Sequence, residues 1–178
     1  ILDFGCGLST LKDVIEEQGR TNITYAGLDV SDRFIRASRR KHPDTTFYHR
    51  DVLAEGVSDL PDFDYVIMNG IFHSSLGHSD SEMQAYLESL VALMFTKARV
   101  GLAFNVMSTQ VDWRRDDLFH VPLDGLLTFL SRNVTRHVVV RHDYGIYEYT
   151  VYAYREPCFP GRAGAPRLVG PRPEARDT

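Results

Sequence analysis

The segment Ile1-Leu2-Asp3-Phe4-Gly5-Cys6-Gly7-Leu8-Ser9-Thr10 decides the fold of this chain. It begins as a short apolar run that carries Asp3, and a turn with two glycines and two hydroxyl residues follows. A second apolar run ends 22 residues after Gly7, at Asp29. Two strands that each deliver a carboxylate near their carboxyl ends are typical of an open α/β sheet, in which ligands bind outside those ends.

The composition of the chain narrows the class of protein. With 178 residues, 43% of them hydrophobic and 25% charged, the chain has the length and the proportion of apolar to charged residues of one globular domain. A net charge of -4 argues against nucleic acid as a partner. No apolar run approaches the roughly 20 residues that cross a bilayer, so we expect no membrane partner. The two cysteines, Cys6 and Cys158, favour a reducing, cytoplasmic location. Nothing in the sequence predicts an oligomeric state.

The two carboxylates and the glycines predict a nucleoside-cofactor site. Asp29 is placed to accept hydrogen bonds from the hydroxyls of a ribose, and Gly5 and Gly7 let a ligand approach the backbone. A dinucleotide fingerprint needs a third glycine, where this chain has Thr10. In addition, the carboxylate of Asp3 would repel a pyrophosphate. A cofactor with a cationic amine and a sulfonium removes that conflict, and S-adenosylmethionine has both groups and a ribose.

On these residues the chain resembles the class I S-adenosylmethionine-dependent methyltransferases, whose first motif is an acid followed by G-x-G. Ser9 stands where the family more often has a third glycine, which is a mild departure. The resemblance implies that Asp51 accepts a hydrogen bond from the adenine amino group and that Val52 lines the ring. It also places Asn69 and Gly70 beside the sulfonium end of the cofactor. The predicted cofactor-binding residues are therefore Asp3, Gly5, Cys6, Gly7, Asp29, Val30, Asp51, Val52, Asn69 and Gly70.

Segments with the apolar spacing of a strand alternate with segments that have the spacing of a helix, and this pattern predicts the rest of the fold. We expect an α/β architecture: a doubly wound, mostly parallel seven-stranded sheet with an antiparallel C-terminal hairpin strand and helices on both faces. A helix follows the glycine turn, capped by Ser9 or Thr10, and a polar loop covers 72–82. The remaining strands are expected at 23–30, 46–52, 64–70, 100–108, 136–144 and 147–155, and the remaining helices at 31–42, 83–94 and 122–133.

The domain boundaries follow from composition and from the resemblance. Residues 1–155 are expected to form the methyltransferase domain, and residues 156–178, rich in Pro, Arg and Gly, a disordered tail. Members of this family carry a helical stretch before the first strand, so we expect that such an N-terminal cap is missing here.

Residues for the methyl acceptor follow less directly from the sequence. His73 is the candidate general base, because a histidine at the mouth of the site can take a proton near neutral pH, although an exposed loop histidine is the simpler reading. No cluster has metal-ligand spacing. Arg114 is a candidate for an anionic group on the acceptor or, alternatively, a surface charge balanced by neighbouring aspartates. The predicted substrate-binding residues are Phe72, Asn105, Trp113 and Arg114.

These patterns predict one function and leave two alternatives. The predicted function is S-adenosylmethionine-dependent methyl transfer to a small-molecule acceptor by in-line displacement. One alternative is a nicotinamide-dependent oxidoreductase, which Asp3 and Thr10 disfavour. The other is a catalytically degenerate module that binds a cofactor or a partner protein.

Overall fold

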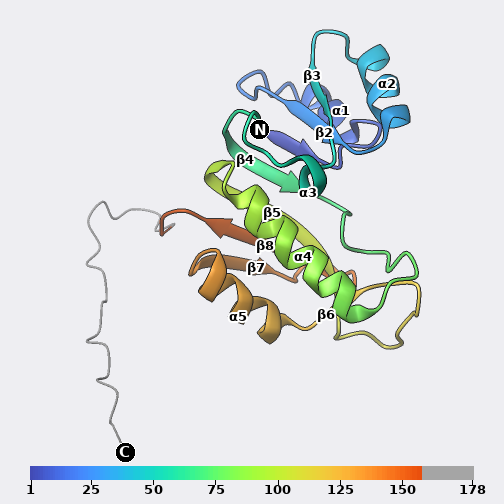
Figure 1. The fold of residues 1–178 in the computed structure, drawn as a ribbon, viewed down its shortest axis with the longest axis vertical. Helices are drawn as coiled ribbons and strands as arrows, with labels where there is room; N and C mark the ends of the chain where they lie inside the picture. The colour runs from blue at the N-terminus through green and yellow to red at the C-terminus, as the bar shows by residue number, and fades with distance from the viewer. Residues whose placement is uncertain (158–178) are drawn as a thin grey trace, which may run out of the picture.

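The computed structural model describes residues 1–157, which form one central sheet with helices on both faces (Figure 1). The predicted tail therefore lies almost wholly outside the described residues. The strands are β1 (Leu2–Phe4), β2 (Ala26–Asp29), β3 (Thr46–His49), β4 (Phe63–Met68), β5 (Ala98–Ser108), β6 (His120–Val121), β7 (His137–Arg141) and β8 (Glu148–Tyr154).

The topology of the sheet matches the predicted fold. Seven strands are hydrogen-bonded in the order β3-β2-β1-β4-β5-β8-β7, and β6 pairs with β5 beside this path. Strands β1 to β5 pair in parallel, whereas β8 runs antiparallel to both β5 and β7. The mostly parallel sheet and its antiparallel C-terminal hairpin strand are thus confirmed, and the short strand β6 makes the sheet eight-stranded rather than seven-stranded. The order reverses at β1, so the carboxyl ends of β1 and β4 flank the crevice in which such folds bind ligands.

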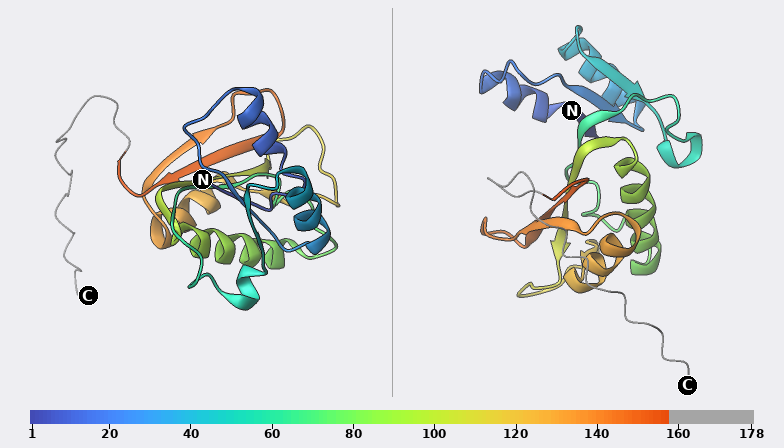
Figure 2. Two further views of the ribbon diagram at one scale, coloured as in Figure 1. Left: turned by 90° about the horizontal axis from the view of Figure 1, so that it is seen from above. Right: turned by 90° about the vertical axis from the view of Figure 1, so that its left-hand side faces the viewer.

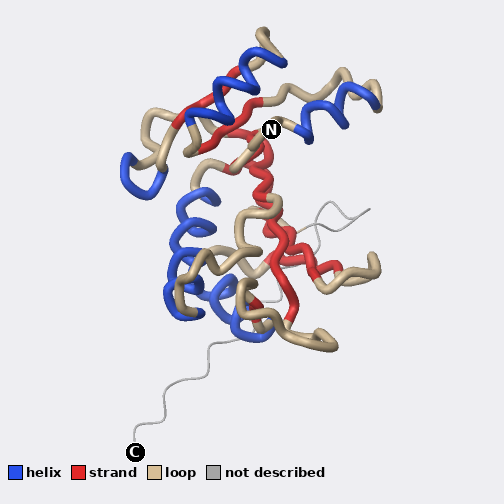
Figure 3. The backbone as a smooth tube through the Cα atoms, turned by 90° about the vertical axis from the view of Figure 1, so that its right-hand side faces the viewer, coloured by secondary structure: helices blue, strands red, loops and turns tan. Residues whose placement is uncertain are grey.

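The helices form two layers around the sheet (Figures 2 and 3). Figure 3 shows α4 and α5 on one side of the strands and α1 on the other. Ile15 of α1 and Ile35 of α2 pack in one buried cluster, while α4 and α5 contribute to the larger core on the opposite face. The helices are α1 (Thr10–Glu17), α2 (Asp32–Lys41), α3 (Val52–Glu55), α4 (Asp80–Phe95) and α5 (Leu123–Asn133).

Helix α4 shows how sequence sets both the start and the packing of an element. Ser79 and Glu82 form a reciprocal capping box, so the helix begins at Asp80, inside the segment predicted as loop. Its apolar residues recur at helical spacing, and Leu87 and Leu90 are fully or almost fully buried against the sheet. Burying each such side chain stabilises the fold by about 1.5–3 kcal/mol.

Two further local predictions are wrong, and one short strand was not predicted. The third strand ends at His49 rather than at 52, because Asp51 accepts hydrogen bonds from the backbone N–H groups of Leu53 and Ala54 and starts the short helix α3. The two-residue strand β6 was not predicted. Ser9 precedes α1 but makes no side-chain cap, since its backbone is left-handed, with φ of 59°. Ser31, in contrast, caps α2 as expected by accepting from the N–H of Phe34.

None of the helices within residues 1–157 is long and apolar enough to cross a membrane.

Candidate cofactor and acceptor site

The turn after β1 is fastened to the end of β2. The backbone N–H groups of Gly5 and Cys6 both donate to the carbonyl of Leu28, at 2.7 and 3.0 Å. Gly5 has φ of +70° and Gly7 has φ of +52°, in the left-handed region that glycine adopts without a steric cost. A Cβ at Gly5 would also lie 2.0 Å from Cδ1 of Ile71. The shape of this turn therefore favours glycine at both positions.

Asp29, at the carboxyl end of β2, is held by two backbone groups. Its Oδ2 accepts from the N–H of Gly7 at 2.9 Å, and its Oδ1 accepts from the N–H of Ser31 at 2.8 Å. A carboxylate offers about four lone-pair sites, so each oxygen retains capacity for a further donor. The side chain is thus a fixed acceptor at the site predicted for ribose.

Asp3, in β1, is buried. Its Oδ2 accepts a hydrogen bond from the hydroxyl of Tyr25 at 2.7 Å. Burial raises the pKa of the Asp3 carboxyl, the Tyr25 hydroxyl opposes that rise, and the charge of Asp29 adds to it. Burial likewise raises the pKa of the Cys6 thiol to about 12, so this cysteine stays protonated at neutral pH. A cation placed near the carboxylates of Asp3 and Asp29 would lower the pKa of Asp3 again.

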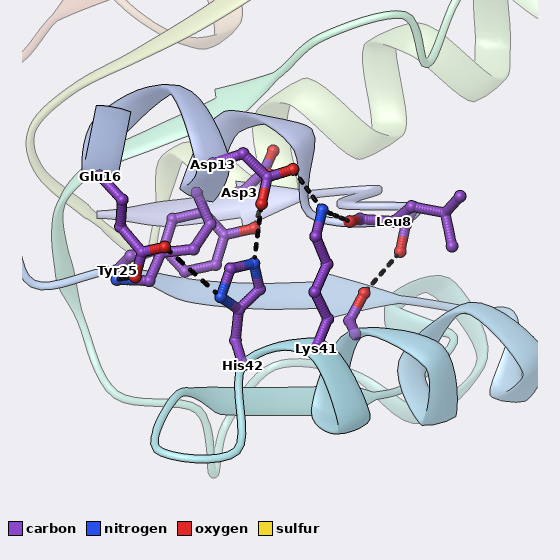
Figure 4. Close-up of polar contacts among 10 residues, drawn as sticks. Asp3, Leu8, Asp13, Glu16, Tyr25, Lys41 and His42 are labelled. Atoms are coloured by element: carbon purple, nitrogen blue, oxygen red, sulfur yellow. Dashed lines mark hydrogen bonds and ion pairs between the residues drawn. The ribbon is translucent and has the colours of Figure 1, made fainter. Parts of the chain in front are cut away.

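Helix α2 clamps the glycine turn from outside (Figure 4). The hydroxyl of Ser38 donates to the carbonyl of Gly7 at 2.9 Å, and Nζ of Lys41 donates to the carbonyl of Leu8 at 3.4 Å. Lys41 also forms an ion pair with Asp13 of α1. The turn is therefore shaped before any ligand arrives, which reduces the conformational entropy lost on binding.

Two cavities meet at this turn, of about 540 and 420 Å³, within the range of small-molecule sites. Gly5 lines both. Every residue predicted to bind the cofactor lines one of them. Asp3, Cys6, Gly7 and Asn69 line the larger cavity, and Asp29, Val30, Asp51, Val52 and Gly70 line the smaller one.

The structure places one of the four predicted substrate-binding residues at a cavity and the other three elsewhere. Phe72 has no exposed surface and packs edge-on against Phe104 in the core, because the chain turns inward after β4. Trp113 is 66% exposed and packs edge-on against Tyr147, and Arg114 is exposed too. None of these three lines either cavity, whereas Asn105 lines the larger one.

A chain of polar contacts joins the loop after β4 to the last strand. Oδ1 of Asn105 accepts from the N–H of Gly70 at 2.8 Å, and its Nδ2 donates to Oε2 of Glu148 at 2.7 Å. Nε2 of His73 lies 3.4 Å from the same Glu148 oxygen. Sequence analysis missed Glu148. Alternation along β8 places it on one face with Thr150, but only the strand pairing shows that this face adjoins Asn105.

No group of three or more His, Cys, Asp or Glu side chains among residues 1–157 is arranged to hold a metal ion.

Comparison with known proteins identifies the family to which this chain belongs. Residues 2–98 match the family described as Methyltransferase domain. The "Putative methyltransferase Rv1506c" of Mycobacterium tuberculosis (strain ATCC 25618 / H37Rv) is 30% identical over 153 residues, which cover 85% of this chain and 90% of that protein. The chain therefore belongs to the class I S-adenosylmethionine-dependent methyltransferases.

Solved structures share the fold at low sequence identity. Magnesium protoporphyrin IX methyltransferase (ChlM) from Synechocystis PCC 6803, solved with bound SAM, has a TM-score of 0.59 and 14% identity, covering 87% of this chain and 69% of that one. SAM-bound CalS10, an amino pentose methyltransferase from Micromonospora echinaspora, has a TM-score of 0.60 and 11% identity, with 87% and 82% covered. A SAM-dependent methyltransferase from Archaeoglobus fulgidus has a TM-score of 0.60 and 16% identity, with 86% and 85% covered.

Proposed function

We propose that this methyltransferase binds S-adenosylmethionine across both cavities and methylates a small-molecule acceptor. The observation that carries the proposal is the place of Gly5, which lines both cavities, with Asp3 in one and Asp29 in the other. Asp29 would accept hydrogen bonds from the ribose hydroxyls, and Asp3 would face the cationic methionine end. Val30 and Val52 would enclose the adenine, with Asp51 near its amino group.

The cofactor supplies a methyl group that is already activated by the sulfonium, so the chain itself has little covalent chemistry to perform. Its residues position and shield the reacting groups. The bonds from Gly7 and Ser31 fix the direction of Asp29, and the protonated thiol of Cys6 offers no competing thiolate nucleophile. Alignment of reacting groups is worth an effective molarity on the order of 10⁵ M or more.

On the acceptor side, His73 is the proposed general base; it lines neither cavity but lies against Glu148, which contacts Asn105 of the larger cavity. Its Nε2 lies beside Glu148, which would stabilise the imidazolium formed when the ring takes a proton from the acceptor. Asn105 would contact the acceptor or the methionine end, because it lines the larger cavity. A base is needed only for an acceptor that must lose its proton, such as a hydroxyl.

Two observations support a small acceptor. The net charge of -4 disfavours nucleic acid, and the cavities have the size of small-molecule sites. By their names, ChlM and CalS10 act on a porphyrin and an amino pentose. Low cysteine usage supports a cytoplasmic location for the reaction.

A thermal-shift comparison tests the proposal. S-adenosylhomocysteine at about 100 times its Kd stabilises the native state by about 2.7 kcal/mol, which raises the Tm of a chain this size by about 5–10 °C. We expect that shift with S-adenosylhomocysteine and none with NADH. Stabilisation by NADH alone would contradict S-adenosylmethionine as the cofactor and would favour the nicotinamide-dependent alternative. Cofactor binding by the full-length protein without turnover on any acceptor would point to a degenerate member.

A further inference from the structure

The contact chain from Gly70 through Asn105 to Glu148 ends at a carboxylate that the proposed function leaves without a role toward the cofactor. Both hydrogen bonds are short, at 2.8 and 2.7 Å, and both are partly buried. They join residues 35 and 43 positions apart in the sequence. A contact of this kind ties the loop after β4 to β5 and β8.

Glu148 and the N–H of Gly70 together determine which way the Asn105 amide points. A carboxylate is only an acceptor, so it takes the NH₂ group of Asn105 and leaves the amide oxygen for the N–H of Gly70. With the amide reversed, its oxygen would face the carboxylate and its NH₂ would face the backbone N–H. Both hydrogen bonds would then be lost in a partly buried place, which costs more than their formation gains.

The Asn69–Gly70 turn is placed where the two cavities adjoin. Asn69 lines the larger cavity and Gly70 the smaller one, as Gly5 does for both. Gly70 has φ of +76°, so the turn depends on a left-handed residue that a hydrogen bond can hold in place. A ligand that spans both cavities must pass this turn.

We propose that Glu148 is a positioning residue for the cofactor: it orients the Asn105 amide, which in turn holds the Asn69–Gly70 turn in its binding conformation. The inference rests on the proposed function, since it takes S-adenosylmethionine as the ligand that passes the turn. The same carboxylate lies 3.4 Å from His73, so one side chain links the cofactor turn to the candidate base.

A reciprocal exchange of the two side chains tests this role. In Asn105→Asp two carboxylates face each other, and we expect the affinity for S-adenosylhomocysteine to fall about tenfold. In Glu148→Gln the amide oxygen still accepts from Asn105, so affinity stays within about threefold of wild type.

The double variant, Asn105→Asp with Glu148→Gln, restores a complementary pair. The amide introduced by Glu148→Gln donates to the carboxylate introduced by Asn105→Asp, and the second oxygen of that carboxylate still accepts from the N–H of Gly70. We therefore expect its affinity to recover to within about threefold of wild type.

Calorimetry measures these affinities at a temperature where every variant is folded, and the Tm without ligand is measured in parallel. Asp143→Asn, an exposed charge change on the same hairpin, is the matched control and should bind as wild type does. Unchanged affinity in Asn105→Asp, with only its Tm lowered, would show a merely structural contact and overturn the inference. A double variant as weak as Asn105→Asp overturns it too.

If Asn105→Asp does not fold, Glu148→Ala against Glu148→Gln decides the question. We then expect about tenfold weaker binding in the first and near wild-type binding in the second, and equal affinities refute the positioning role. A wild-type chain that does not bind S-adenosylhomocysteine refutes the proposed function instead, so the two failures are distinguishable.

Discussion

The cofactor turn and the acceptor side of the cavity are built in different ways. The turn, Asp29 and the clamp of α2 all lie within the first 41 residues, in the continuous segment from β1 to α2, and their contacts join residues 22 to 33 positions apart. The acceptor side is assembled from the loop after β4, from β5 and from β8, through contacts between residues 35 and 43 positions apart. The first region therefore comes from one continuous segment that a sequence motif marks, whereas the second joins three separate segments that no motif connects.

The largest expected effect of a substitution in the cofactor region is that of Asp29→Ala. It removes the ribose acceptor together with the hydrogen bonds from Gly7 and Ser31. Hydrogen bonds to charged groups contribute about 1.5–3 kcal/mol each, so we expect affinity for S-adenosylhomocysteine to fall about 100-fold in calorimetry. Asp29→Asn is the control, since its amide oxygen retains one acceptor and its loss should be smaller. Equal affinity of Asp29→Ala and wild type would rule out the ribose assignment.

A pair of glycines separates backbone strain from ligand contact. Gly7 and Gly19 have similar φ values, +52° and +61°, and neither has an atom within 4 Å of an added Cβ. Alanine at either position costs about 1–2 kcal/mol, so both variants should lose about 2–8 °C in Tm. Only Gly7→Ala places a methyl group in the larger cavity, and its affinity for S-adenosylhomocysteine should fall about 30-fold. Equal binding losses in the two variants would attribute the effect to strain alone.

The smallest effect on binding in this series is expected for Asp3→Asn. This variant should lower the affinity for the cofactor and raise the stability of the fold. Loss of the charge facing the cationic end should weaken S-adenosylhomocysteine binding about tenfold. Because burial raises the pKa of Asp3 in the folded state, its charged form destabilises the fold above that pKa. The asparagine variant should therefore have the higher Tm at pH 7–8.

The higher Tm of Asp3→Asn should depend on pH, and the difference from wild type should decrease on acidification. As pH falls through the raised pKa of Asp3 toward the usual carboxyl value of about 4, the wild-type side chain becomes neutral and the Tm difference should shrink to nothing. A scan of Tm against pH for both proteins measures it. A difference that grows on acidification would contradict the account of a buried, destabilised carboxylate.

The sequence predicts the fold well because the fold follows from local patterns, and it predicts a cofactor set whose members lie together in the structure. The alternation of strand and helix and the short final hairpin link predict the sheet, and all residues of the predicted cofactor set line the paired cavities. The predicted ends of elements were wrong where a single side chain caps a helix and so sets its first residue, as Asp51 does for α3 and Ser79 for α4. The burial of Phe72 and the exposure of Trp113 could not be predicted, because burial after a strand depends on tertiary packing, which apolar character alone does not reveal.

A crystal structure of the protein with S-adenosylhomocysteine tests the central claim most directly. The account predicts one ligand that crosses Gly5, with its ribose hydroxyls on Asp29 and its amino group facing Asp3. A ligand confined to one cavity, or a ribose bound away from Asp29, would contradict it.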